Sequence, residues 1–130
     1  MTTYQNTHPQ TKTFGTRLRE IRKRKGLSQQ ELGILAGLSS SIAATRINRY
    51  ENNVHRPSLI VAWHIAKALS LPLSFFLANE DRLARLIAVF SKLPENWQEE
   101  VLQAAETRYR KVNGKANKKS KTAKSPPSAN

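Results

Sequence analysis

Apolar residues recur along the first part of the chain at spacings of three and four, the period of amphipathic α-helices. Four stripes and a short apolar run are Phe14, Leu18 and Ile21; Leu32, Leu35 and Ala36; Ala43, Ile47, Tyr50 and Val54; Leu59, Ala62, Ala66 and Leu69; and Phe75, Phe76 and Leu77. No segment shows the alternation that a half-buried strand requires. The pattern therefore predicts an all-α fold that begins with five short helices.

Signals for helix ends stand between these stripes. Ser28 followed by Glu31 is a capping box, in which the side chain of each residue binds the backbone N–H of the other. Gly26 and Gly37 follow apolar stripes at the position where a left-handed residue ends a helix. Ser58, directly after a proline, is a typical N-cap. The signals predict a pair of helices joined by a tight turn at Gly37.

A second group of stripes follows and is interrupted at Pro94. Its apolar members are Leu83, Leu86, Ile87, Phe90 and Leu93, and then Trp97, Val101, Ala104, Ala105 and Tyr109. We interpret residues 81–110 as an appended α-hairpin. Ile60 and Trp63 make the outer face of the fourth helix more apolar than water favours, so we expect later helices or a second subunit to cover them.

The chain ends carry no such periodicity. Residues 1–12 are rich in Thr, Gln and Asn, and residues 112–130 in Gly, Asn, Lys, Ser and Pro, so both predict disorder. Residues 13–78 are then the five-helix domain. Residues 79–111 are a C-terminal helical extension for packing or dimerisation.

The charge balance points to an anionic partner. The chain has 22 Lys and Arg against 9 Asp and Glu, a formal net charge of +13. Seven cations lie in residues 12–25, and six lysines without an acid lie in residues 111–130. Such clusters favour polyanions, although a lysine-rich tail can equally serve only to solubilise the chain. Both readings of the tail stay open.

The composition also excludes several kinds of site. With no cysteine and three histidines that lack metal-ligand spacing, we expect no metal site. Scattered carboxylates and the lack of a glycine-rich phosphate loop after a strand predict no catalytic site and no cofactor. No apolar run is long enough for a membrane span. The first 14 residues do not resemble a signal peptide, so we expect a cytoplasmic protein.

The motifs occur in a characteristic order: GTRLREIRKRKGLSQQELGILAG, then INRYENNVHRPSL, then IAKALSLP. Together they resemble the helix-turn-helix family of phage-repressor and Cro type, also called the XRE family, over residues 14–78. The resemblance implies a five-helix lambda-repressor-like domain whose third helix enters the major groove of double-stranded DNA. It also implies a homodimer on two half-sites about one helical turn apart.

The chain departs from the family at one place. Gly37 and Glu51 are 14 positions apart, about one helical turn of 3.6 residues more than the family usually has. In one interpretation Ser39 or Ser40 caps a recognition helix that is one turn longer. In the other, which we favour, the turn itself is longer and the helix begins near Ile42.

The resemblance assigns candidate contacts with DNA when positions are counted back from the end of the third helix. The base-reading candidates are Ala44, Thr45, Arg46, Asn48 and Arg49. Arg49 can bind guanine with two hydrogen bonds and Asn48 can bind adenine likewise. One or two of these side chains can instead contact only phosphate, the more frequent kind of contact.

Phosphate contacts are expected from helix starts and loops. The candidates are Gln29, Ser39, Ser40, Ser41, Asn52, Asn53, His55 and Arg56. Gln29 resembles the family's phosphate-binding glutamine at a helix N-terminus, where exposed N–H groups also favour an anion. The resemblance further implies a largely buried structural ion pair between Arg22 and Glu51.

Two hypotheses of function follow. The first is a sequence-specific DNA-binding transcriptional regulator, most simply a repressor that acts as a dimer on a promoter operator. The alternative is a DNA-binding antitoxin-like protein that binds a heterologous protein through residues 81–110, where the apolar stripe offers a surface.

Overall fold

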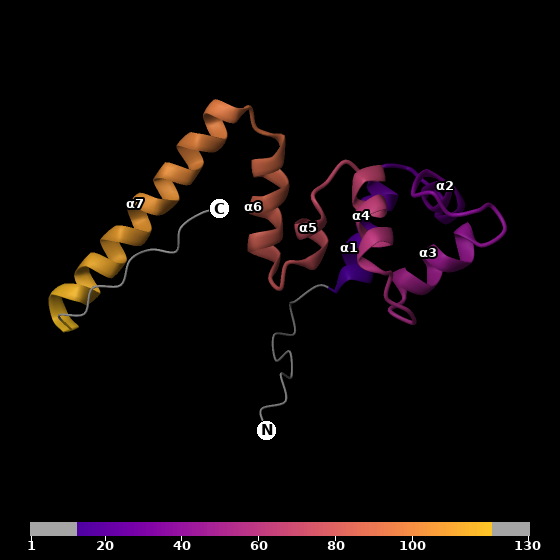
Figure 1. Cartoon of the computed structure of the whole chain (residues 1–130), viewed down its shortest axis with the longest axis horizontal. Coiled ribbons are helices and arrows are strands. Elements are labelled where there is room, and N and C mark those ends of the chain that lie inside the picture. The colour runs from indigo at the N-terminus through magenta and orange to yellow at the C-terminus, as the bar shows by residue number, and fades with distance from the viewer. Residues whose placement is uncertain (1–12, 121–130) are drawn as a thin grey trace, which may run out of the picture. The chain divides into compact units, whose positions relative to one another are not determined.

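The computed structural model describes residues 13–120, with side chains to residue 114, as seven helices without a strand in that range. They are α1 (Phe14–Arg24), α2 (Gln29–Leu35), α3 (Ala43–Glu51), α4 (Leu59–Ala68), α5 (Leu73–Leu77), α6 (Asp81–Lys92) and α7 (Glu95–Ser120) (Figure 1). The predicted all-α class is confirmed. The chain divides into two compact units, with the boundary in the sequence between Ser91 and Lys92, and we describe each by itself.

The core of the first unit lies among α1 to α5. Its largest fully buried side chains are Leu18, Leu32, Ile47, Ile65, Leu69 and Phe76. They come from all five helices, and α3 packs on both α1 and α2. Burial of such a side chain stabilises a fold by about 1.5–3 kcal/mol, so this shared core fixes the five helices relative to one another.

The helix ends follow the predicted signals. Ser28 and Glu31 form both hydrogen bonds of the capping box, and the Ser58 side chain caps α4. Gly26 and Gly37 have φ values of 69° and 89°, in the left-handed region where a side chain is disfavoured. Asn53 also adopts a positive φ, 57°, after α3. Local sequence therefore sets the ends of α1, α2 and α3 and the starts of α2 and α4.

The additional residues lengthen the turn between α2 and α3. α3 begins at Ala43 with Ile42 as its N-cap residue, close to the start that we favoured. Before it, the backbone N–H groups of Ile42 and Ala43 both donate to the Ser39 carbonyl, at 3.1 and 3.0 Å. The turn is thus held by hydrogen bonds of its own.

Several apolar residues expected in the core are exposed. They are Leu35, Val54, Leu59 and Leu77, with exposed fractions between 56% and 69%. Val54 follows the positive-φ residue Asn53, so the helical period that placed it inside no longer applies there. Leu59 is the first residue of α4 and points outward, while Ala62, Ile65 and Ala66 face the core.

α6 belongs to the first compact unit, which extends to Ser91 and so beyond residue 78. Arg17 of α1 is 2% exposed and binds the start of this helix. Its Nη1 donates to the carbonyls of Phe75 and Ala78, and its Nη2 lies 3.2 Å from Asp81 Oδ1. The guanidinium thereby satisfies carbonyls at the end of α5 and pairs with the first residue of α6. Ala84 is the buried residue of α6.

α7 corrects the predicted disorder of residues 112–130. The helix continues to Ser120, so residues 112–120 are helical. Lys, which occurs three times in residues 112–120, has high helix propensity, and Gly114 alone costs only about 1 kcal/mol. The remaining predicted disorder, at residues 1–12 and 121–130, lies outside the described residues.

Candidate nucleic-acid interface

α3 has one buried and one exposed side. Ala43, Ile47, Tyr50 and Glu51 are buried against the domain. On the other side Thr45, Arg46, Asn48 and Arg49 are exposed, and Ala44 is half-buried beside them. Donors, acceptors and positive charge are thus gathered on the solvent side of one helix. Such a face suits the base edges and phosphates of a DNA groove.

A glycine permits the close approach of α2 and α3. A Cβ atom at Gly33 would lie 2.6 Å from Ala43 Cβ and 2.8 Å from Ala43 Cα. Real Cβ atoms essentially never come this close to another heavy atom, so any side chain at Gly33 would push the two helices apart. The position of α3 therefore depends on the absence of a side chain at residue 33.

An ion pair holds the C-terminal end of α3. Arg22 Nε donates to Glu51 Oε2 at 2.6 Å, and Arg22 Nη2 donates to Oε1 at 3.0 Å. Gln29 Nε2 donates to the same Oε1 at 3.2 Å, and Arg22 Nη1 donates to the Leu27 carbonyl at 2.8 Å. Two planar groups aligned in this way form a strong, charge-assisted pair. The pair links α1, α2 and α3 at one point.

The two segments that flank α3 are polar and exposed. Ser39, Ser40 and Ser41 stand in the turn before it, with Ser39 Oγ and Ser41 Oγ 3.2 Å apart. Asn52, Asn53, His55 and Arg56 stand in the loop after it, all exposed. These seven residues lie at the two ends of the exposed face of α3, which is where a helix in a groove approaches the DNA backbone.

Comparison with known proteins identifies this arrangement. The sequence model of the helix-turn-helix family matches residues 18–76. The transcriptional regulator BswR, of which a crystal structure is known, is 35% identical in sequence to this chain. The match covers 72% of this chain and 92% of the BswR chain, with a TM-score of 0.67. The chain belongs to the helix-turn-helix family of phage-repressor and Cro type. Family and fold support a DNA-binding transcriptional regulator.

A second solved structure shares the fold. It is a complex of the SinR protein with the SinI protein. The matching chain is 24% identical in sequence to this one, and the match covers 75% of this chain and 98% of that chain with a TM-score of 0.53. No curated protein matches the chain. In the terms of the helix-turn-helix family, α2 and α3 are the motif and α3 is the recognition helix.

The structure gives partners within the protein to some predicted phosphate contacts. Gln29 is half-buried and binds Glu51, so part of its hydrogen-bonding capacity serves the motif itself. Asn53 Nδ2 donates to Thr13 Oγ1 at 3.1 Å, which joins the end of α3 to the N-cap of α1. Asn52 Nδ2 donates to the Asn48 carbonyl at 2.9 Å. These amides shape the end of the recognition helix as well as facing solvent.

The basic cluster near the N-terminus separates into two groups. Arg17 and Arg22 are buried and bind groups within the domain. The exposed cations of α1 and its C-cap are Arg19, Lys23, Arg24 and Lys25. Lys12 lies outside the described residues. The exposed group adds to the positive field that attracts DNA.

Sequence reasoning missed Gln30. Its side chain binds both the long turn and the start of the recognition helix: Nε2 donates to the Ser40 carbonyl at 2.9 Å, and the Ala44 N–H donates to Oε1 at 3.1 Å. The available signal was Ile42, a poor N-cap residue, which leaves the first turn of α3 in need of an acceptor from elsewhere.

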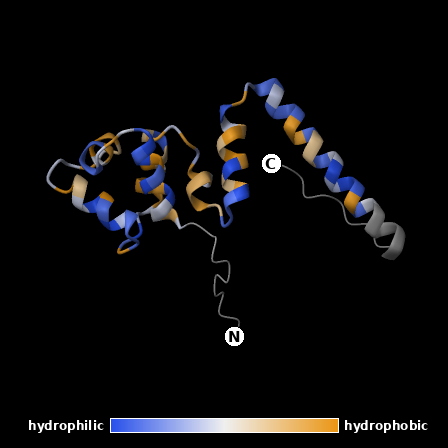
Figure 2. Ribbon diagram, turned by 180° about the vertical axis from the view of Figure 1, so that it is seen from behind, coloured by the Kyte–Doolittle hydropathy of each residue, from blue (hydrophilic) through white to orange (hydrophobic). Residues whose placement is uncertain are grey.

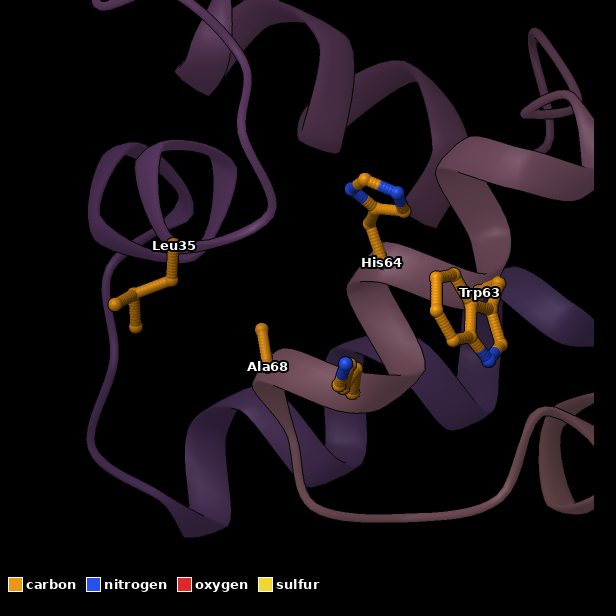
Figure 3. Close-up of a pocket in the computed structure, with 5 residues that line it drawn as sticks. Leu35, Trp63, His64 and Ala68 are labelled. Atoms are coloured by element: carbon orange, nitrogen blue, oxygen red, sulfur yellow. The ribbon is translucent and has the colours of Figure 1, made fainter.

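A shallow pocket of about 300 Å³ lies between α2 and α4, apart from the exposed face of α3. Leu35, Trp63, His64, Lys67 and Ala68 line it (Figure 3). Lys67 Nζ lies 4.9 Å from the centre of the Trp63 ring, a cation–π contact.

Within residues 13–114, no three His, Asp or Glu side chains gather as metal ligands would. No helix in the described range is long and apolar enough to cross a membrane.

Proposed function

We propose that this protein binds a specific operator sequence in double-stranded DNA and represses transcription as a homodimer. The observation that carries the proposal is the two-sided recognition helix. Its inner side is buried, and its outer side presents Thr45, Asn48 and Arg49 to solvent. Arg49 offers two donors to guanine, Asn48 a donor and an acceptor to adenine, and Thr45 a hydroxyl or methyl contact.

Contacts with the DNA backbone complete the proposed interface. The turn serines and the polar residues of the α3–α4 loop flank the recognition helix, and the exposed cations of α1 raise the local positive charge. Each phosphate that a cation neutralises contributes a slope of about −0.9 to the plot of log affinity against log salt. We therefore expect affinity for all sequences to fall steeply as salt is raised.

The experiment is the selection of bound sequences from random duplex DNA with the full chain. The wild-type protein should enrich one motif made of two related half-sites. Arg49→Ala should lose preference at one base pair of each half-site. Lys25→Ala, an exposed cation outside the recognition helix, should keep the motif and at most weaken binding to every sequence. Absence of any enriched motif would refute sequence-specific binding.

Dimer formation is proposed to use the C-terminal helices. α6 carries Leu83, Leu86 and Val89, which are 39%, 52% and 60% exposed. Hydrophobic and hydrophilic stretches both occur along this helix (Figure 2). Apolar side chains repeated on one helix are characteristic of a protein-binding face. Light scattering of the full chain should give twice the monomer mass.

A reporter gene tests repression. When it is placed behind the selected operator, its expression should fall in the presence of the protein.

The same exposed residues favour a second candidate function. In this alternative, residues 81–110 bind a heterologous protein, and DNA binding serves an antitoxin-like complex. A monomer in light scattering that gains mass only when one specific protein is added would support this candidate. A stable homodimer that binds its operator alone would support the repressor.

A further inference from the structure

The recognition helix starts without a capping side chain of its own. Ile42 stands at the N-cap position and makes no side-chain capping hydrogen bond. Helix N-termini leave backbone N–H groups without intrahelical partners, and an N-cap Ser, Thr, Asp or Asn normally binds one of them. In α3 this acceptor comes from another helix, because the Ala44 N–H donates to Gln30 Oε1 of α2 at 3.1 Å.

The nitrogen of the Gln30 side-chain amide binds the long turn. Gln30 Nε2 donates to the Ser40 carbonyl at 2.9 Å, within the stretch that makes the turn longer than usual. One hydrogen bond uses the amide oxygen and the other uses its nitrogen. A carboxylate could make only the bond to Ala44, and an apolar side chain could make neither.

We propose that Gln30 is a positioning residue for sequence readout. Through its two hydrogen bonds it fixes the turn and the first residues of the recognition helix, and so it determines which base pairs Thr45 and its neighbours reach. The far end of the helix is held separately, since Glu51 pairs with Arg22. Gln30 therefore acts on the start of the helix and not on the end that carries Asn48 and Arg49. The inference rests on the proposed sequence-specific DNA binding.

The test compares base preferences from the same random-DNA selection. Thr45→Ala defines the base pairs that depend on the start of α3, and Arg49→Ala defines those that depend on its end. Gln30→Ala should lower preference about tenfold at the Thr45-dependent base pairs, the size of one good side-chain contact with a base. It should leave the Arg49-dependent base pairs unchanged. Gln30→Glu, which keeps the acceptor for Ala44, should give an intermediate loss at the same base pairs.

A matched control separates positioning from stability. Ser28→Ala removes a capping hydrogen bond from the start of the same helix α2, and it does not touch the turn or α3. It should lower the melting temperature and keep the wild-type preference at every base pair. Hydrogen exchange at the Ala44 amide should rise in Gln30→Ala and stay at the wild-type rate in Ser28→Ala.

The outcomes distinguish this inference from the proposed function. A wild-type motif that is unchanged in Gln30→Ala would overturn the positioning role alone. Loss spread evenly over all base pairs in both Gln30→Ala and Ser28→Ala would also overturn it, because stability would then explain both. A wild-type chain that enriches no sequence would refute the proposed function and the positioning role together.

Discussion

Arg22 and Glu51 join α1 to the end of the recognition helix through two hydrogen bonds, of 2.6 and 3.0 Å. The two residues are 9% and 5% exposed, so the pair is shielded from water and salt. A buried ion pair requires both partners, because either charge alone would be buried without a counter-charge and would destabilise the fold. This relationship makes the ion pair a condition for the fold of the DNA-binding unit.

Glu51→Gln should therefore destabilise the protein strongly. The substitution leaves the buried Arg22 guanidinium without its counter-charge, which costs on the order of 3–5 kcal/mol. Denaturant unfolding at neutral pH measures the loss. Glu80→Gln is the control, because Glu80 makes an exposed ion pair with Arg82 at 3.9 Å, and such pairs contribute little. Equal stability of the two variants would contradict a structural role for the buried pair.

Gly33→Ala should separate the two helices of the motif. The added methyl group would lie 2.6 Å from Ala43 Cβ, and overpacking of this kind costs about 1–3 kcal/mol. We expect a lower melting temperature and weaker DNA binding. Gly114→Ala offers the matched control: nothing lies within 4 Å of its new Cβ, so this change should stabilise α7 by about 0.5–1 kcal/mol. Unchanged unfolding of Gly33→Ala would show that the helices tolerate a wider separation.

Arg17→Met should loosen α6 while keeping the apolar length of the side chain. The variant loses the bonds to the end of α5 and to Asp81, and hydrogen bonds of a charged group are worth about 1.5–3 kcal/mol. Hydrogen exchange at the α6 amides should then quicken by about 10- to 100-fold.

Asp81→Asn should give a smaller increase in the same exchange rates, since it keeps the contacts of Arg17 with α5. Arg82→Met, at an exposed neighbouring position, should exchange like the wild type. Wild-type exchange in Arg17→Met would mean that α6 is held by other contacts.

Leu86→Asp should weaken the proposed dimer. The leucine is 52% exposed on α6, and a charge buried in an apolar interface costs several kcal/mol. Light scattering should show a shift from dimer to monomer, with the melting temperature nearly unchanged. Arg85→Asp introduces the same charge at an exposed polar position of α6 and should remain dimeric. A dimer that persists in Leu86→Asp would move the interface elsewhere.

The sequence predicts best what is decided by neighbours along the chain. Ser28 with Glu31, and the glycines at 26 and 37, act through backbone groups only a few residues away, and their roles were predicted correctly. The start of the recognition helix at Ala43 lies beside the favoured start near Ile42, but its capping acceptor comes from Gln30 of another helix and not from a local signal. These local signals are enough to define five helices and the motif.

The missed features depend on residues far apart in sequence. The contacts of Arg17 with α5 and α6 span about 60 positions, and nothing near it in sequence indicates that this cation is buried. Leu35 and Leu59 fit helical stripes, but both are exposed in the folded domain. Gln30 reaches a turn whose length was itself open from the sequence. Helix packing, which the stripes alone do not specify, decides all of these.

The two-sided construction of α3 has a consequence for evolution and engineering. Everything that anchors this helix, from Ala43 to Glu51, belongs to its inner side or its ends, whereas Thr45, Asn48 and Arg49 contribute nothing to the buried core. Exchange of these three side chains changes the surface offered to DNA without a change in the scaffold. Under the proposed role of these residues in base readout, new operators are accessible by a few substitutions, and the scaffold can be inherited intact while its target diverges.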